Sequence, residues 1–257
     1  MFQRVWSIAV NTYRESMRDR ILLSVLVFAL VMIVFSLFVG SISLEQDKTI
    51  IEDMGLALIF FLQLFIVVFV GANMLYKEIE RKTFFMIVPK PIRKYEIILG
   101  KYAGLGMTNV LVTALASLVF FGIVFWQAHS FAGFPAMLLA ITFGFIETMV
   151  ILLVSILFSS LTSPILASVY TVALFLVGHS SSTLRGVIEK QSSLATRYGL
   201  YALYYLFPNL EKFNIRNEVV YGIVPDVKQV LIVLVYAAAY SLFLFILSSV
   251  IFERREY

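Results

Sequence analysis

The sequence predicts an all-α membrane protein with six transmembrane helices, preceded by an amphipathic helix at the membrane surface. Of its 257 residues, 61% are hydrophobic and only 14% are charged, whereas roughly 25% are charged in a typical soluble domain. The mean hydropathy is +0.94. Uncharged runs recur along the chain, and each has at least the about 20 residues that a helix needs to cross a bilayer. Backbone polar groups in hydrocarbon must be hydrogen-bonded internally, so these runs must be helices.

The charged residues divide the chain into six expected spans that form one transmembrane domain over residues 1–257. The uncharged run 102–146 is too long for one span, and the polar stretch 126–130 interrupts it. The uncharged run 148–184 is likewise interrupted at 159–164, where serines, a threonine and a proline cluster. The spans are therefore expected near 21–40, 55–76, 102–125, 135–158, 165–183 and 229–251.

The basic residues predict the orientation. Thirteen of the twenty lysines and arginines lie in 1–20, 77–101 and 252–257. Cytoplasmic loops carry an excess of these residues, so we place the three segments, and both termini, in the cytoplasm. The short outer loops carry only Lys48. We expect a multi-pass protein of the cell (plasma) membrane without a cleavable signal peptide, because mixed polar residues precede the first apolar run.

Two further segments are neither spans nor simple loops. Residues 1–20 place apolar side chains at helical spacing, with polar residues mostly on the other side, which predicts an amphipathic helix in the cytoplasmic interface. These apolar residues are Phe2, Val5, Trp6, Ala9, Tyr13 and Met17. The segment 184–228 is expected outside the cell. Its aromatic residues favour the headgroup level of a membrane, so we expect helix packed at the outer surface.

No motif in the sequence indicates an enzyme. The absence of cysteine excludes disulfides, thiolate metal sites and a cysteine nucleophile. There is no GxxxxGK[ST] loop to hold ATP and no HExxH pair to hold a metal ion. The two histidines, His129 and His179, are expected near the outer ends of spans. His179 and Ser180 are a conceivable base and nucleophile, but adjacent residues rarely face each other, and no acid lies near them in the sequence.

Glu147 is the one charge inside an expected span. A carboxylate facing lipid is costly, so such residues usually face a bundle interior or a wet cavity. Two interpretations stay open: Glu147 lines a substrate path, or it is a structural group hydrogen-bonded to a neighbouring helix. No basic residue is expected within a span to pair with it. Gly100 and Gly104, with Gly106 close behind, have the spacing that lets helices approach closely.

The cytoplasmic segment 77–101 carries the strongest signal in the sequence. It interleaves both signs of charge with apolar residues, and an elbow of Pro89, Lys90 and Pro91 divides it. Anchoring by positive charge alone would need only a few lysines. The mixed composition predicts two short helices whose apolar face meets another surface. The simpler alternative is a solvated turn with lysine anchors.

This segment resembles the first cytoplasmic loop of permease subunits of ATP-binding-cassette transporters, of the type 2 exporter class. The residues that carry the resemblance are Glu78, Glu80, Thr83, Pro91, Arg93, Tyr95, Glu96, Gly100 and Lys101. The stretch 11–20 is similar to that family's approach to the first span. The stretch 206–214 resembles members of the nitrous-oxide-reductase-maturation and gliding-motility kind.

The resemblance implies a type 2 ABC transporter fold and a complex of two permease copies, as a homodimer or related heterodimer, with two separate cytoplasmic ATPase subunits. ATP and Mg would be bound by those subunits, and this chain would bind no cofactor and no nucleic acid. The residues implied in coupling to the ATPase are Glu78, Glu80, Arg81, Thr83, Arg93, Glu96 and Lys101. The main rival is a proton-coupled secondary transporter that uses Glu147. The missing internal repeat disfavours it, because such carriers often have one.

Overall fold

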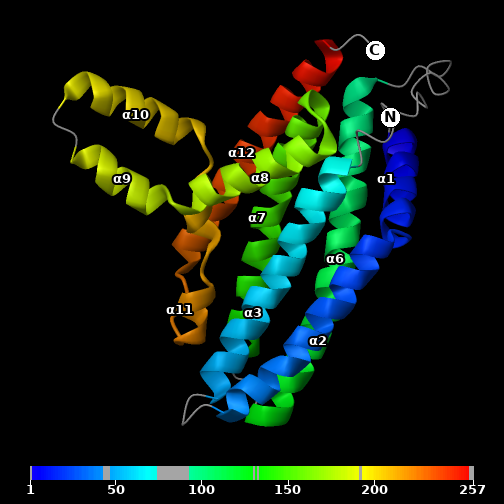
Figure 1. The fold of residues 1–257 in the computed structure, drawn as a ribbon, viewed down its shortest axis with the longest axis vertical. Helices are drawn as coiled ribbons and strands as arrows, with labels where there is room; N and C mark the ends of the chain where they lie inside the picture. The colour runs from blue at the N-terminus through cyan, green and yellow to red at the C-terminus, as the bar shows by residue number, and fades with distance from the viewer. Residues whose placement is uncertain are drawn as a thin grey trace.

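The chain folds into helices, without a strand, throughout the part that the structure describes, which is residues 2–42, 47–73, 93–129, 131, 133–190 and 193–254 of a computed structural model. The first helix, α1, and the end of the last, α12, lie at the same end of the long axis (Figure 1). The helices are α1 (Phe2–Met17), α2 (Arg20–Ile42), α3 (Asp47–Phe65) with a π-helical turn (Ile66–Val70), α6 (Lys94–Ala128), α7 (Phe134–Leu161), α8 (Pro164–His179), α9 (Ser181–Glu189), α10 (Leu194–Leu206), a 3₁₀ turn (Leu210–Phe213), α11 (Arg216–Val220) and α12 (Val227–Arg254).

Five helices of the described residues are long and apolar enough to cross a bilayer: α2, α3 with its π turn, α6, α7 and α12. The prediction of an all-α, multi-pass membrane protein is confirmed to this extent. The fifth expected span, 165–183, takes a different form, because α8 and α9 pass the same test only as a pair that is bent by 62°.

The bend between α8 and α9 follows from small and hydroxylated residues. A Cβ on Gly178 would lie 2.7 Å from the Leu210 side chain, so glycine is what allows the 3₁₀ turn to pack here. The hydroxyl of Ser180 donates to the Leu176 carbonyl at 2.9 Å, and that of Ser181 donates to the Gly178 carbonyl at 2.7 Å. Hydroxyls that bond to carbonyls of the preceding turn bend helices. The sequence-based expectation of a span near 165–183 did not take these bonds into account.

Helices α3 and α6 begin well before the spans expected at 55 and 102. The 35 residues of α6 extend over about 52 Å at 1.5 Å per residue, whereas the hydrocarbon core is about 30 Å thick. Charge marks where hydrocarbon ends and does not mark where a helix ends. Residues 94–101 of the predicted cytoplasmic segment are therefore the first two turns of α6.

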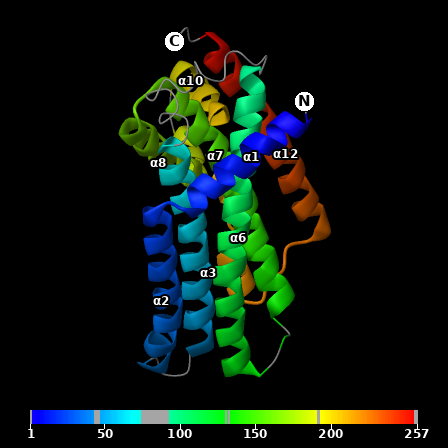
Figure 2. The ribbon, with the colours of Figure 1, turned by 90° about the vertical axis from the view of Figure 1, so that its right-hand side faces the viewer.

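Helix α1 lies diagonally across the N-terminal part of α6 (Figure 2). The glycine spacing predicted close packing, and the contact confirms it. A Cβ on Gly100 would lie 2.7 Å from Cβ of Ile8, and one on Gly104 would lie 2.5 Å from the Ala9 carbonyl oxygen. The large residues Phe2 and Trp6 stay 80% and 53% exposed, so the described part of the chain leaves this apolar surface of α1 uncovered.

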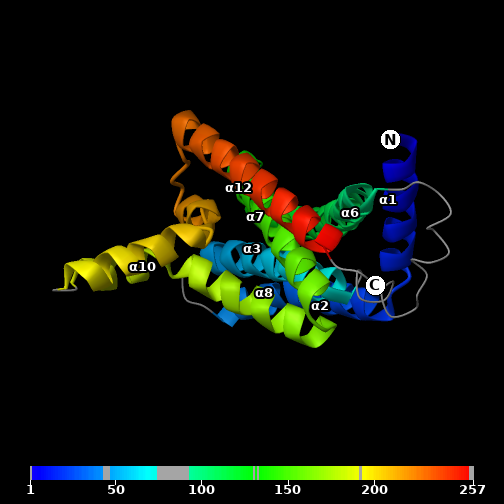
Figure 3. The same ribbon diagram turned by 90° about the horizontal axis from the view of Figure 1, so that it is seen from above.

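The core lies between α3, α6 and α7, and the other helices surround it. In the most apolar stretch of α7, 67% of the residues are buried by the rest of the protein. The corresponding share is 28% in α2 and 17% in α12. Seen along the long axis, α1 and the α9–α10 hairpin lie on opposite sides of the bundle (Figure 3). The outward faces of α2 and α12 are apolar and need lipid or another protein surface to cover them.

Candidate functional site

Glu147 lies halfway along α7 and is only 1% exposed, so it faces the interior of the bundle as the cost of a lipid-facing carboxylate predicts. Its Oε1 atom lies 3.4 Å from Nε2 of His179. The expectation that no basic residue of a span reaches Glu147 is therefore wrong. The partner is the last residue of α8, which the bend at Ser180 ends inside the bundle.

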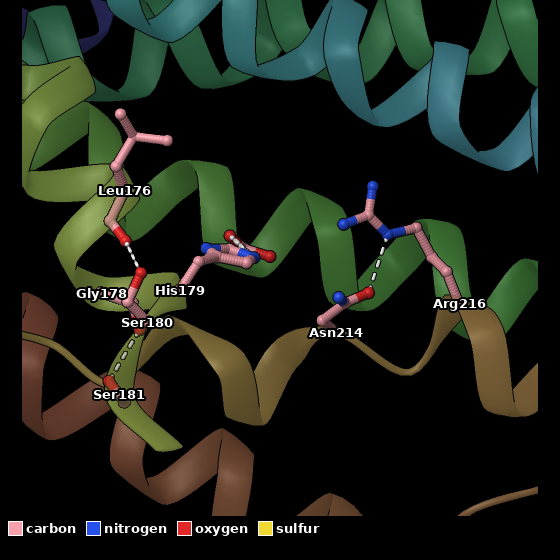
Figure 4. A network of polar contacts seen from close by, with 8 residues as sticks. Leu176, Gly178, His179, Ser180, Ser181, Asn214 and Arg216 are labelled. Carbon is pink, nitrogen blue, oxygen red and sulfur yellow. Dashed lines mark hydrogen bonds and ion pairs between the residues drawn. The ribbon is translucent and has the colours of Figure 1, made fainter. Parts of the chain in front are cut away.

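His179 is the last residue of α8, and its contact with Glu147 places it beside the middle of α7. The centroid of its ring lies 4.5 Å from the centroid of the Phe175 ring and 6.4 Å from that of the Phe60 ring. Ser180 does not face it, since its hydroxyl is bonded to the Leu176 carbonyl (Figure 4). The structure thus supplies the acid that the sequence did not show, but it does not assemble a base with a nucleophile.

Arg216, the first residue of α11, brings a third ionisable group to the same region. Its Nε donates to Oδ1 of Asn214 at 3.0 Å, and its guanidinium lies 3.9 Å from the centroid of the Phe60 ring. Burial lowers the pKa of Arg216, and the charges of Glu147 and Asp53 oppose this shift. An arginine remains charged nevertheless, because its normal pKa is so high. Arg216 therefore places a positive charge near the buried carboxylate.

Amides and hydroxyls continue the polar path between the helices. Nε2 of Gln63, on α3, donates to Thr113 on α6 at 3.2 Å. Nδ2 of Asn109, on α6, donates to Thr148 on α7 at 3.1 Å. Ser155 of α7 and Ser168 of α8 donate to the Val68 carbonyl in the π turn that extends α3, at 3.5 and 3.4 Å. Ser159 of α7 donates to the Ala72 carbonyl just beyond that turn at 2.8 Å. Such bonds hold helices together in lipid, where the hydrophobic effect does not.

The N-terminal end of α6 holds three of the residues that the resemblance implies in ATPase coupling. The backbone N–H of Arg93 donates to Oε2 of Glu96 at 3.3 Å, which caps the helix. Lys101 is 1% exposed, so its side chain belongs to the protein interior. Nζ of Lys94 donates to the carbonyls of Phe252 at 3.3 Å and Glu253 at 3.1 Å, tying the start of α6 to the end of α12. The other four, Glu78, Glu80, Arg81 and Thr83, lie outside the described residues.

The described residues contain no group of three or more histidine, aspartate or glutamate side chains placed to hold a metal ion. No known protein-family model matches the chain, and no curated protein matches it as a relative. The arrangement of residues is therefore what supports any functional assignment. It consists of a buried ionisable cluster within the bundle and a tightly packed junction of α1, α6 and α12 at the end of the bundle where α6 begins.

Proposed function

We propose that this chain is the membrane-spanning permease subunit of an ATP-binding-cassette exporter of type 2, driven by a separate ATPase. The observation that carries the proposal is the junction at the start of α6. Helix α6 begins at Lys94, within the charged segment 77–101, and its first turns contact both α1, through Gly100 and Gly104, and α12, through Lys94. A push on the segment would move α1, α6 and α12 together.

The length of α6 supports the transmission of such a movement. One unbroken helix of 35 residues runs from the charged segment to the far end of the bundle, where His129 ends it. A helix is stiff over this distance, and packed helices shift as units rather than deforming continuously. On this proposal, Arg93 and Glu96 fix the first turn of α6, and Lys101 acts through the packing of its buried side chain. Glu78 and Glu80 would make the direct contact with the ATPase.

Six crossings and a second permease copy are part of the proposal. The bent α8–α9 pair would supply the fifth crossing together with the segment that leads to α12. The poorly covered faces of α2 and α12 would contact lipid and the second copy, as a homodimer or a related heterodimer. The substrate would pass between the two bundles, and Glu147 would line or support that path.

Reversing the charges of Glu78 and Glu80 to lysine is expected to separate the ATPase from the permease. Charged contacts set register and partner choice at an interface, and a like-charge contact costs several kcal/mol. The double variant should reach the membrane normally but recover much less ATPase on purification. A matched control reverses two exposed carboxylates of the described chain, Glu189 and Glu218. If both double variants retain a fully coupled ATPase, residues 78 and 80 are ordinary loop charges.

A proton-coupled secondary transporter is the second candidate, and the contact between Glu147 and His179 favours it. Two titratable groups in direct contact inside a bundle are the elements of a proton relay. Glu147→Gln removes the proton-accepting oxygen while keeping the size of the side chain. A proton-driven carrier in liposomes would stop transport after this change, without any ATPase present. On the ABC proposal with Glu147 in a structural role, ATP-driven transport continues in the Glu147→Gln variant.

A further inference from the structure

A cavity of about 700 Å³ lies between the α9–α10 hairpin and α12, away from the buried ionisable cluster. Six of its ten lining residues are tyrosines, contributed by α10 and α12. The charged residues among the ten are Arg185 and Lys212, and no carboxylate is among them. The volume suits a ligand of drug or lipid-headgroup size. The charges that line the cavity favour an anion.

The hydroxyl groups of two of these tyrosines have protons to donate. The backbone N–H of Asn209 donates to Oη of Tyr236 at 2.7 Å, and Nδ2 of Asn209 donates to Oη of Tyr204 at 3.4 Å. A phenol that accepts a hydrogen bond still has its own O–H to give. Nζ of Lys212 lies 4.5 Å from the centroid of the Tyr236 ring. One ammonium and two phenolic donors therefore line the same cavity.

Asn209 adds an acceptor beside these donors. Its Oδ1 atom is buried and has no hydrogen-bond partner in the described part of the chain. A buried acceptor left without a donor is costly. A ligand that carries both an anionic group and hydroxyls would satisfy the tyrosines, the lysine and this amide oxygen together.

An apolar cavity of about 310 Å³ continues the first along α12. The two share Tyr205, Tyr236 and Tyr240, and the second adds Ala239 and Phe243. The combined groove is polar and basic at one end and apolar at the other. This is the profile of an amphiphile with a charged head and a hydrocarbon chain.

We propose that this groove binds an anionic membrane lipid, with its headgroup phosphate at Lys212 and the two tyrosine hydroxyls, and with an acyl chain along α12. Arg185 adds a second positive charge at the rim. It is paired with Glu189 at 3.0 Å, but both side chains are largely exposed, and exposed pairs of this kind are weak. Binding a lipid here would anchor the hairpin to α12. The proposal does not depend on an ATPase partner.

The test is native mass spectrometry of the purified, delipidated full-length chain in detergent. The probes are phosphatidylglycerol, phosphatidylcholine and inorganic phosphate. The wild type should bind phosphatidylglycerol about tenfold more tightly than phosphatidylcholine, which corresponds to a single charge-assisted contact. Lys212→Gln should remove most of this preference, whereas Lys228→Gln should keep it, because Lys228 is exposed at the start of α12 and does not line the groove. Inorganic phosphate in excess should not displace the lipid, because it has no chain.

A second variant protects the test against misfolding. Tyr204→Phe with Tyr236→Phe removes two donors but keeps both rings, and it should also weaken phosphatidylglycerol binding while leaving the elution profile unchanged. Equal affinity for the two lipids would overturn the proposal, as would equal losses in Lys212→Gln and Lys228→Gln. Full displacement by inorganic phosphate would show a site for free anions and would overturn the lipid assignment.

Discussion

Replacing Glu147 with alanine is expected to destabilise the protein by about 1–3 kcal/mol, the range for leaving the partner of a buried polar group unsatisfied. Glu147 is 1% exposed, and its loss removes the carboxyl group that contacts His179 and whose charge acts on Arg216. Denaturant unfolding in detergent, followed by circular dichroism, measures the change. Glu147→Gln should cost less, because the amide oxygen still accepts a hydrogen bond.

A double-mutant cycle separates charge coupling from simple loss of packing. If Glu147 and Arg216 compensate each other, Glu147→Ala with Arg216→Met should cost less than the sum of the two single changes. Additive costs would show that the two residues are independent. A cost below about 1 kcal/mol for Glu147→Ala, typical of surface changes, would contradict the view that this cluster organises the bundle.

Replacing Gly104 with leucine is expected to push α1 off α6. The new Cβ would lie 2.5 Å from the Ala9 carbonyl oxygen and 2.6 Å from Cβ of Thr12. These are backbone and branch atoms of α1 that cannot turn aside, and overpacking of this kind costs about 1–3 kcal/mol. We expect reduced thermal stability and, in the complex with its ATPase, hydrolysis that no longer drives transport.

Gly122 is a matched control on the same helix. A Cβ there meets nothing within 4 Å, so Gly122→Leu should be neutral, or stabilising by up to about 1 kcal/mol through helix propensity. If both leucine variants remain coupled and equally stable, the contact between α1 and α6 is not needed to transmit movement. If both lose stability equally, the effect belongs to leucine in this helix and not to the α1 contact.

Much of the architecture can be predicted from the sequence because lipid imposes simple rules. Uncharged runs, the positions of lysine and arginine, and the glycine pair on α6 each report a single local constraint. The broken fifth span is harder to predict, because an apolar run such as 165–183 has the same composition whether its helix is straight or bent. Its bend depends on Ser180 and Ser181 bonding to the preceding turn and on Leu210 arriving at Gly178.

The candidate site was only half visible in the sequence for a related reason. Glu147 was evident as the single charge in an apolar run. Its neighbours His179 and Arg216 were not, since they are 32 and 69 residues away along the chain and meet only because α8 ends inside the bundle. The sequence did hold a useful signal, because a buried carboxylate needs a partner. Arg216 lies two residues after the stretch 206–214, which the sequence analysis had already singled out.

Isolation of the tagged wild-type chain from its native membranes in mild detergent tests the central claim most directly. The proteins that elute with it are identified by mass spectrometry, and ATP hydrolysis by the eluate is measured. The account predicts a cytoplasmic ATPase with its own phosphate-binding loop, in about equal amount to the permease, and hydrolysis that falls when Glu78 and Glu80 are reversed. A permease that elutes without any ATPase, and that transports in liposomes on a proton gradient alone, would contradict it.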